Sequence, residues 1–270
     1  MSDPATASAA ESLLGPGDPP PVTVVNEGGK ADVLLLCDHA SHTIPRSLGG
    51  LGLGSVDLAR HIAGDIGASS VAHHLSARFD APVVLAGFSR LVIDCNRRPD
   101  DPTSIPLISE TTVIPGNRAV SAAERKRRAD ACFEPYHARV RGFLDGFAAR
   151  GVVPLILSIH SFTPVFKGVA RPWHFGILWN RDPRVPKPLI GNLAKMPGVV
   201  VGDNEPYSGK DEYGYTIMHH GAKRGLPHVL IEVRDDLIRD GQNVARWAGI
   251  LGDALAPILA DPKLRRVEQF

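Results

Sequence analysis

The feature that most constrains the fold of this chain is a series of short, uninterrupted apolar segments that alternate with helical patterns. VLLLCDH at 33–39, VVPLILSIHS at 152–161 and HVLIEVR at 228–234 are typical of strands buried on both faces of a sheet. Further strands are predicted in PVVLAGF, RLVIDCN and HFGILWN, and helices at about 55–68, 121–150, 188–196 and 242–260. This alternation predicts a three-layer α/β/α fold around a mixed, mostly parallel sheet.

The length and composition indicate a single domain. The chain has 270 residues, which is enough for one α/β domain with a buried core. Residues 1–21 are rich in Ala, Ser, Gly and Pro, so we expect a poorly ordered N-terminal tail there. We expect residues 22–270 to form one domain, because no repeat or long linker divides them.

Charge and cysteine usage restrict the partners and the compartment. The net charge of +1 gives no field that would attract a nucleic acid or a membrane surface. No apolar run approaches the roughly 20 residues of a transmembrane helix. The N-terminus has no secretory signal pattern, and three scattered cysteines fit a reducing compartment. We therefore expect a cytoplasmic protein with a small-molecule partner.

Reactive side chains stand where the apolar strands end. The first strand ends in His39, the second contains His160, and the last contains Glu232 and ends in Arg234. An unpaired ionisable group is expensive to bury, so a buried strand has little structural reason to end in one. Ligands of parallel sheets bind beyond the carboxyl ends of the strands. The pattern therefore predicts that these side chains converge at one edge of the sheet.

A catalytic zinc ion usually has three protein ligands, and these are commonly neutral imidazole or carboxylate groups. His39 and His160 suit the ligand role, and Glu232 suits proton transfer to and from water. The third ligand is open between His42 and Asp65. The His-x-x-His spacing works only if the chain turns after His39, whereas Asp65 is expected on a helix. The remaining histidines in helical patterns are expected at the surface or in packing.

A second polar cluster occurs in SRLVIDCNRR at 89–98. Arg90, Asn96 and Arg97 stand where a predicted strand gives way to a loop. An arginine fork binds a carboxylate through two hydrogen bonds, and Asn can orient it. A structural ion pair between these arginines and Asp94 explains the same pattern equally well.

Several strings, taken in order, resemble one known family. CDHASHTIP, HIAGDIGA, SRLVIDCNR, SIHSF, DNEPYSG and LIEVRDDL resemble the N-formylglutamate amidohydrolase family over residues 33–237. That family is similar in fold to the zinc carboxypeptidases and the aspartoacylase group. Those enzymes bind zinc through a His-x-x-Glu pair and a later His, and use a later Glu as catalytic base. The resemblance implies that His39 and His160 bind one zinc or other divalent ion per chain and that Glu232 is the base.

The resemblance also implies substrate contacts. Asn96 and Arg97 resemble the Asn-Arg pair that contacts substrate in the aspartoacylase group. Arg90 resembles the upstream arginine that polarises the scissile carbonyl. Ser161 and Arg234 are further candidates for contacts with the substrate.

One position departs from the related enzymes. His42 replaces the Glu of His-x-x-Glu, and close relatives more often carry Asn there, which is a poor zinc ligand. The chemistry therefore slightly favours Asp65 as the third ligand, with His42 behind it or in contact with substrate.

The expected reaction is hydrolysis of a linear amide such as N-formyl-L-glutamate, which yields formate and L-glutamate in histidine degradation. One alternative is a deacylase or carboxypeptidase-like hydrolase of another N-acyl amino acid or short peptide. The alternative from another class is a binding protein that keeps the fold without turnover. Loss of the glutamate would favour this last reading, but Glu232 is present.

Overall fold

The computed structural model describes residues 12–210 and 214–270. A seven-stranded sheet forms the middle layer in the order β1-β3-β2-β6-β11-β9-β10. Strands β2, β3, β6 and β11 are parallel to their neighbours in this set, while β1 and β9 run antiparallel to β3 and β11. The predicted mixed, mostly parallel sheet is therefore confirmed. The strands are β1 Val22–Val25, β2 Val33–Cys37, β3 Val83–Ala86, β6 Leu155–Phe162, β9 Phe175–Leu178, β10 Val201–Asp203 and β11 His228–Arg234.

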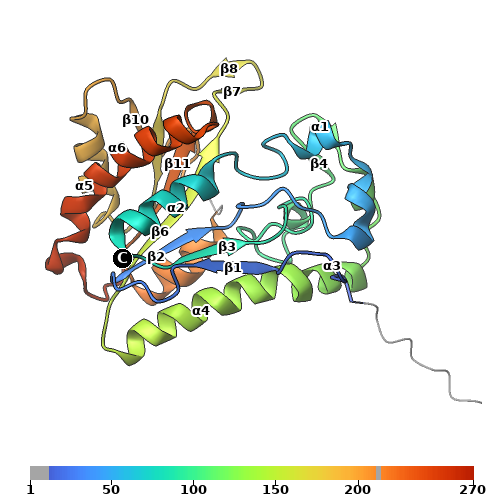
Figure 1. Cartoon of the computed structure of the whole chain (residues 1–270), viewed down its shortest axis with the longest axis horizontal. Helices are drawn as coiled ribbons and strands as arrows, with labels where there is room; N and C mark the ends of the chain where they lie inside the picture. The colour runs from blue at the N-terminus through green and yellow to red at the C-terminus, as the bar shows by residue number, and fades with distance from the viewer. Residues whose placement is uncertain (1–11, 211–213) are drawn as a thin grey trace, which may run out of the picture.

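Helices cover both faces of the sheet (Figure 1). One face carries α2 (Ala68–Phe79), α5 (Pro186–Ala194) and α6 (Gly241–Leu259), and the other carries α4 (Glu134–Ala149). Residues of β2 alternate between the two cores: Leu35 packs with α2 and α6, and Leu34 packs with α4. This alternation follows from the period of two in a strand, and it explains why the segment is apolar throughout.

The helix predicted at 121–150 is present but not uniform. It begins with α3 (Ala122–Arg128), passes through a π-helical turn at Ala129–Phe133 and continues as α4. Ser121 caps its first turn, because its hydroxyl accepts a hydrogen bond from the Glu124 backbone N–H at 3.1 Å.

The helix predicted at 55–68 was wrong. Only α1 (Ser55–Leu58) is helical there, and α2 begins at Ala68. Gly67 has a φ of 77°, which glycine adopts at little cost, and it turns the chain into α2. A Cβ on Gly64 would lie 2.7 Å from the Ser41 carbonyl oxygen, so this loop packs too closely for a regular helix. Asp65 consequently lies in a loop before α2.

The strand predicted at 90–96 was also wrong, because the segment forms turns. The backbone N–H of Val92 donates to Ser89, and that of Asn96 donates to the Asp94 carboxylate at 2.8 Å. The apolar side chains of this segment are buried against the N-terminal residues and the helix that precedes α4. Apolar composition here reflects burial of a loop and not pairing in the sheet.

The N-terminal segment packs earlier than the sequence indicates. Residues 1–11 of the expected tail lie outside the described residues. Leu13 is buried in a cluster with Phe88 and Ile93. Contact with the domain therefore begins well before Val22.

Two short hairpins extend from the domain. One joins β4 (Ile108–Ser109) to β5 (Thr112–Val113), and the other joins β7 (Val165–Phe166) to β8 (Val169–Ala170).

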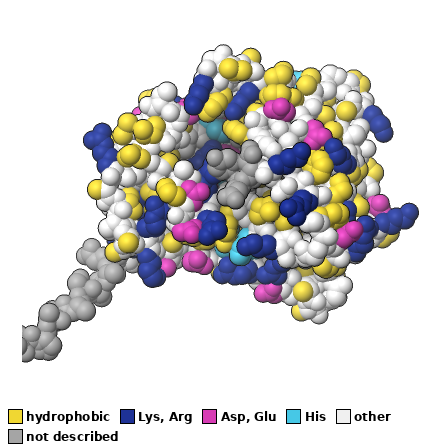
Figure 2. Space-filling model, turned by 180° about the vertical axis from the view of Figure 1, so that it is seen from behind, with side chains coloured by type: hydrophobic (Ala, Val, Ile, Leu, Met, Phe, Trp, Pro, Cys, Tyr) yellow, Lys and Arg dark blue, Asp and Glu magenta, His cyan; other side chains and the backbone are white. Residues whose placement is uncertain are grey.

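Acidic and basic side chains are interspersed over the face shown in Figure 2. Among the described residues, no helix is both long and apolar enough to cross a membrane.

Candidate metal centre and active site

The carboxyl ends of β2, β6 and β11 meet at one edge of the sheet, as the sequence predicted. His39 follows β2, His160 lies in β6, and Glu232 of β11 pairs in register with His160. The loop before α2 brings Asp65 to the same edge, where its backbone N–H donates to the His39 carbonyl at 2.9 Å. One ligand atom each from His39, Asp65 and His160 lie within 4.8 Å of one another, and all three residues are buried.

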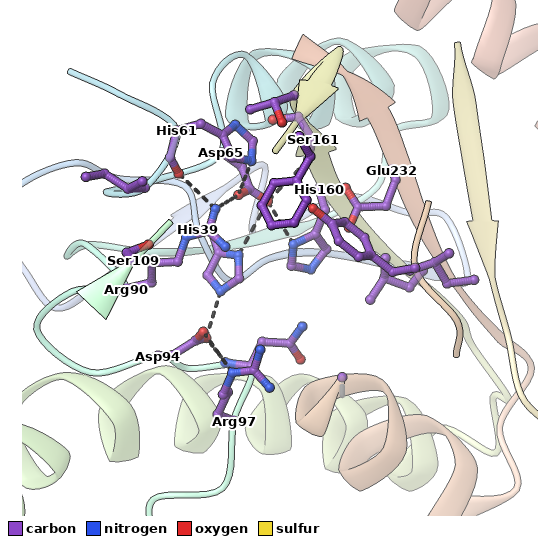
Figure 3. A pocket seen from close by; sticks show the side chains of 18 of the residues that line it. His39, His61, Asp65, Arg90, Asp94, Arg97, Ser109, His160, Ser161 and Glu232 are labelled. Carbon is purple, nitrogen blue, oxygen red and sulfur yellow. Dashed lines mark hydrogen bonds and ion pairs between the residues drawn. The ribbon is translucent and has the colours of Figure 1, made fainter. Parts of the chain in front are cut away.

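Both imidazole rings present the same nitrogen to Asp65 (Figure 3). Nδ1 of His160 lies 2.9 Å from Asp65 Oδ2, and Nδ1 of His39 lies 3.4 Å from the same oxygen. The two rings meet edge to face, with centroids 4.9 Å apart. Two imidazole nitrogens and a carboxylate oxygen therefore converge on one small volume.

The opposite nitrogen of each ring is held by another carboxylate. Nε2 of His39 lies 2.7 Å from Asp94 Oδ1, and Nε2 of His160 lies 3.2 Å from Asp38 Oδ2. An ionised carboxylate only accepts hydrogen bonds, so Asp94 and Asp38 keep a hydrogen on each Nε2, and a cation at the centre would replace the hydrogen on each Nδ1. Carboxylates behind ligating histidines commonly orient the rings and raise their basicity. Asp38 was missed from sequence, although it directly precedes His39.

Asp38 is itself held from two further sides. The Tyr136 hydroxyl donates to its Oδ1 at 2.5 Å, and the Thr216 hydroxyl donates to the same oxygen at 3.0 Å. These donors come from α4 and from the segment before β11, so three parts of the chain determine the orientation of His160.

This donor set fits a divalent metal ion. Nδ1 of His39 is buried, faces Asp65 at 3.4 Å and has no hydrogen bond to any of the described residues. Burial lowers the pKa of His160, but Asp38 and Asp65 outweigh it and raise that pKa well above its usual value. Burial raises the pKa of Asp65, but Arg90 and His39 outweigh it and lower that pKa well below its usual value. The surrounding carboxylates therefore favour positive charge at the centre, as a bound cation would supply.

His42 does not belong to this cluster. Its ring lies beside Gly64, where an added Cβ would meet His42 Nδ1 at 3.1 Å. Its Nε2 is buried without a partner, and burial lowers the pKa of the ring although Asp65 opposes this. Of the two candidates for the third ligand, the structure places Asp65 with His39 and His160.

Glu232 stands beside the cluster with no hydrogen bond to its Oε2. Burial raises its pKa to about 7; His160 opposes this shift and Asp65 reinforces it. A carboxylate with a pKa near neutrality can both accept and return a proton at physiological pH. Arg90 lies on the other side of Asp65, with Nη2 at 2.5 Å from Asp65 Oδ1, and its Nε is buried without a partner.

A pocket of about 360 Å³ opens onto these groups. Asn96, Arg97 and Ser161, which are candidates for substrate contacts, line this pocket. Arg97 Nε lies 3.7 Å from Asp94, and the Ser161 hydroxyl donates to the Ile66 carbonyl at 2.8 Å.

Arg234, by contrast, is not among the residues that line this pocket. Its guanidinium donates to Asp236 and to the Arg171 and Pro172 carbonyls. The described contacts of Arg234 thus support the loop that follows β8.

His61 and Tyr207 are among the pocket residues that were not identified from sequence. His61 was expected at the surface or in packing, yet its Nε2 lies 3.5 Å from Asp65 Oδ1 and its Nδ1 lies 3.4 Å from Asp235 Oδ2. The spacing of four residues to Asp65 was the available signal. Tyr207 also lines the pocket, and its position within DNEPYSG was the only indication.

The comparison with protein families agrees with the strings quoted above. The family described as FGase, N-formylglutamate amidohydrolase, matches residues 31–239, which is most of the chain. The chain belongs to the N-formylglutamate amidohydrolase family. The resemblance inferred from sequence is confirmed, and in this family member the matched region includes every residue of the candidate metal centre.

Solved structures show the same fold. The gene product Atu2144 from Agrobacterium tumefaciens is 39% identical, with a TM-score of 0.89 over 92% of this chain and 98% of that chain. An N-formylglutamate amidohydrolase from Ralstonia eutropha JMP134 is 20% identical, with a TM-score of 0.64 over 88% of this chain and 97% of that chain. No curated protein matches the sequence significantly.

Proposed function

We propose that this family member hydrolyses the amide bond of an N-acyl amino acid, with N-formyl-L-glutamate as substrate and formate and L-glutamate as products. The proposed step belongs to histidine degradation. The observation that carries the proposal is the buried His39, Asp65 and His160 cluster with Glu232 beside it. Membership of the family supports the choice of substrate.

The reaction needs an activated water molecule and a proton carrier. A divalent ion, zinc in our proposal, held by His39, Asp65 and His160 would act as a Lewis acid and lower the pKa of water. Glu232 accepts a proton from the water, whose oxygen attacks the carbonyl carbon. Glu232 then returns that proton to the amide nitrogen as the carbon–nitrogen bond breaks. The free Oε2 and the pKa of about 7 suit Glu232 to both steps.

Arg90 stabilises the negative charge that develops on the carbonyl oxygen. Its Nη2 is occupied by Asp65 and by the His61 carbonyl at 3.0 Å, whereas its buried Nε has no partner. A donor that is already desolvated and oriented is effective, since it needs no reorganisation during the reaction. Asp65 thus holds Arg90 in place in addition to its role as a ligand.

Arg97 binds a substrate carboxylate, and Asn96 orients it. Both residues line the pocket, and Asp94 links Arg97 to His39 through its two carboxylate oxygens. We leave Arg234 out of the substrate site because it lies outside the pocket lining. The Ser161 backbone N–H lies 3.2 Å from Asp65 Oδ2, so this residue supports the ligand.

The test is a panel of N-acyl amino acids offered to the purified protein with zinc. Formate release from N-formyl-L-glutamate should exceed release from N-formyl derivatives of neutral amino acids. Glu232→Gln should keep metal and substrate binding but lower kcat by roughly 10²–10⁴-fold, the range of general acid–base catalysis. Glu205→Gln is the matched control, because Glu205 is exposed and outside the pocket lining.

Other outcomes of the panel favour the other functions. Preference for a longer acyl group or a dipeptide would replace the proposal with a deacylase or carboxypeptidase-like activity. Binding of metal and N-acyl amino acids without release of any acid or amine would indicate a binding protein. A near-normal kcat in Glu232→Gln would refute the role of Glu232.

A further inference from the structure

Tyr207 lines the pocket, and a buried arginine that is not itself among the lining residues lies behind it. Arg171 is only 8% exposed, and no acidic partner to it occurs in the described part of the chain. Its Nη1 donates to the Tyr207 hydroxyl oxygen at 3.1 Å and lies 3.3 Å from Thr163 Oγ1. Burying an arginine charge is costly unless an anion compensates for it. A buried arginine with neutral partners beside a ligand pocket therefore provides a place for a ligand's negative charge.

Aromatic rings hold this arginine in a fixed plane. The Arg171 guanidinium lies 4.6 Å from the Phe166 ring centroid and 4.9 Å from that of Tyr207. Stacking of this kind orients the planar fork, which a lysine cannot reproduce. Because the Tyr207 oxygen accepts from Arg171, its own hydrogen is left to donate to something else. Phe166, Thr163 and Tyr207 all line the pocket.

The loop that carries Tyr207 is clamped to β9. The Asn204 side-chain oxygen accepts from the backbone N–H groups of Trp179 at 3.0 Å and Gly209 at 2.8 Å. A Cβ on Gly209 would lie 2.5 Å from the Trp179 nitrogen, so only glycine permits this approach. The clamp holds the backbone on both sides of Tyr207, whose side chain is 41% exposed.

Tyr207 lines the same pocket as Glu232. Burial raises its pKa, the Glu232 carboxylate raises it further, and Arg171 opposes both effects. The hydroxyl therefore keeps its proton at neutral pH and can act as a donor. Because Tyr207 and Glu232 line one pocket, a substrate whose amide lies at Glu232 can also reach Tyr207.

We propose that Tyr207 is a substrate-positioning residue whose hydroxyl donates a hydrogen bond to a carboxylate of the amino-acid part of the substrate. Arg171 holds that hydroxyl and adds positive charge behind it. The inference rests on the proposed function. Arg97 and Tyr207 both line the pocket, and each is a proposed binding point for one carboxylate. A substrate with two carboxylates would use both.

The first measurement is the KM and kcat of Tyr207→Phe on N-formyl-L-glutamate and on its two monoamides. A hydrogen bond to a charged group contributes enough for KM to rise roughly 10- to 100-fold on N-formyl-L-glutamate, with kcat changed less than about threefold. The monoamide that lacks the carboxylate bound by Tyr207 should show almost no such rise. The same rise on all three substrates would overturn the proposal.

A second variant tests the part played by Arg171. Arg171→Lys should reproduce the selective rise in KM, and the double variant with Tyr207→Phe should be no worse than either single one. Non-additivity is expected because both changes remove the same interaction. Fully additive losses would overturn the coupling. Tyr215→Phe is the matched control, because this tyrosine stacks on His219 and lies outside the pocket lining.

Binding of the product separates this inference from the proposed function. The Kd of L-glutamate for the zinc-supplied protein requires no turnover, and Tyr207→Phe should weaken it roughly 10-fold. If the protein hydrolyses no N-formyl amino acid but shows this loss, the proposed function fails and the inference stands. An unchanged L-glutamate affinity in Tyr207→Phe overturns the inference, whether or not the protein is active. The inference is also overturned if L-glutamate binds neither the wild type nor Tyr207→Phe.

Discussion

Substitution of Glu232 by glutamine should stabilise the metal-free protein at high pH while removing its activity. Burial raises the pKa of Glu232 from 4.5 to about 7 in the folded state. A tenfold change in proton affinity corresponds to about 1.36 kcal/mol, so this rise in pKa corresponds to about 3 kcal/mol. An acid whose pKa is raised on folding favours the folded state fully below pH 4.5, and this contribution is lost as pH rises through 7. Glutamine has no such dependence.

The assay is thermal or denaturant unfolding of both proteins in chelator, at pH values from 4.5 to 8. The quantity compared is the difference in the free energy of unfolding between the two proteins at each pH. Any effect of the substitution that does not depend on pH is the same at every pH and therefore cancels. Relative to Glu232→Gln, the wild type should lose about 3 kcal/mol over this range, which is roughly 6–12 °C in Tm for a domain of this size. Glu205→Gln serves as control for the substitution itself.

Parallel stability curves for the wild type and Glu232→Gln would refute this reasoning. They would mean that Glu232 is solvated or paired in the folded protein. An opposite slope, with the wild type gaining relative stability as pH rises, would mean that the positive charges of His160 and Arg90 outweigh burial.

Three further predictions follow from the site. The protein should bind about one metal ion per chain by elemental analysis, with activity lost in chelator and restored by zinc; full activity in metal-free protein would exclude the metal mechanism. Asp65→Ala should remove the metal at micromolar free zinc, while His42→Asn should retain it and Asp94→Asn should weaken it by roughly 10- to 100-fold; metal loss in His42→Asn alone would make His42 the ligand. Arg97→Lys should raise KM for N-acyl glutamate far more than for an N-acyl amino acid amide, because lysine cannot form the bidentate fork; equal losses would indicate that Arg97 supports the fold.

The strands and their reactive ends could be predicted from sequence because each depends on a local pattern. A strand buried on both faces must be apolar along its whole length, so segments such as 155–162 and 228–234 are recognisable by themselves. Adjacent parallel strands end at the same edge of a sheet, so the sequence alone predicts that His39, His160 and Glu232 lie together.

The two wrong predictions concern segments 55–68 and 90–96. In both, tertiary packing and not a periodic sequence pattern determines the backbone conformation. The pattern at 55–68 has helical spacing, yet Gly64 and Gly67 allow close approach and a left-handed turn that no helix accommodates. The apolar run at 90–96 is buried as a loop. A buried segment is apolar whether it forms a strand, a helix or a loop. Apolar composition alone therefore could not distinguish these backbone conformations.

The sequence by itself determined the family, the layered α/β fold, and the candidate pair His39 and His160 with Glu232. Only the tertiary structure placed Asp65 and not His42 in the ligand cluster, because a loop and not a helix carries Asp65 to the edge of the sheet. Only the tertiary structure revealed Asp38 and Asp94 behind the histidines and Arg171 behind Tyr207. These contacts join residues far apart in the chain, and their chemistry depends on distances that no local sequence pattern encodes.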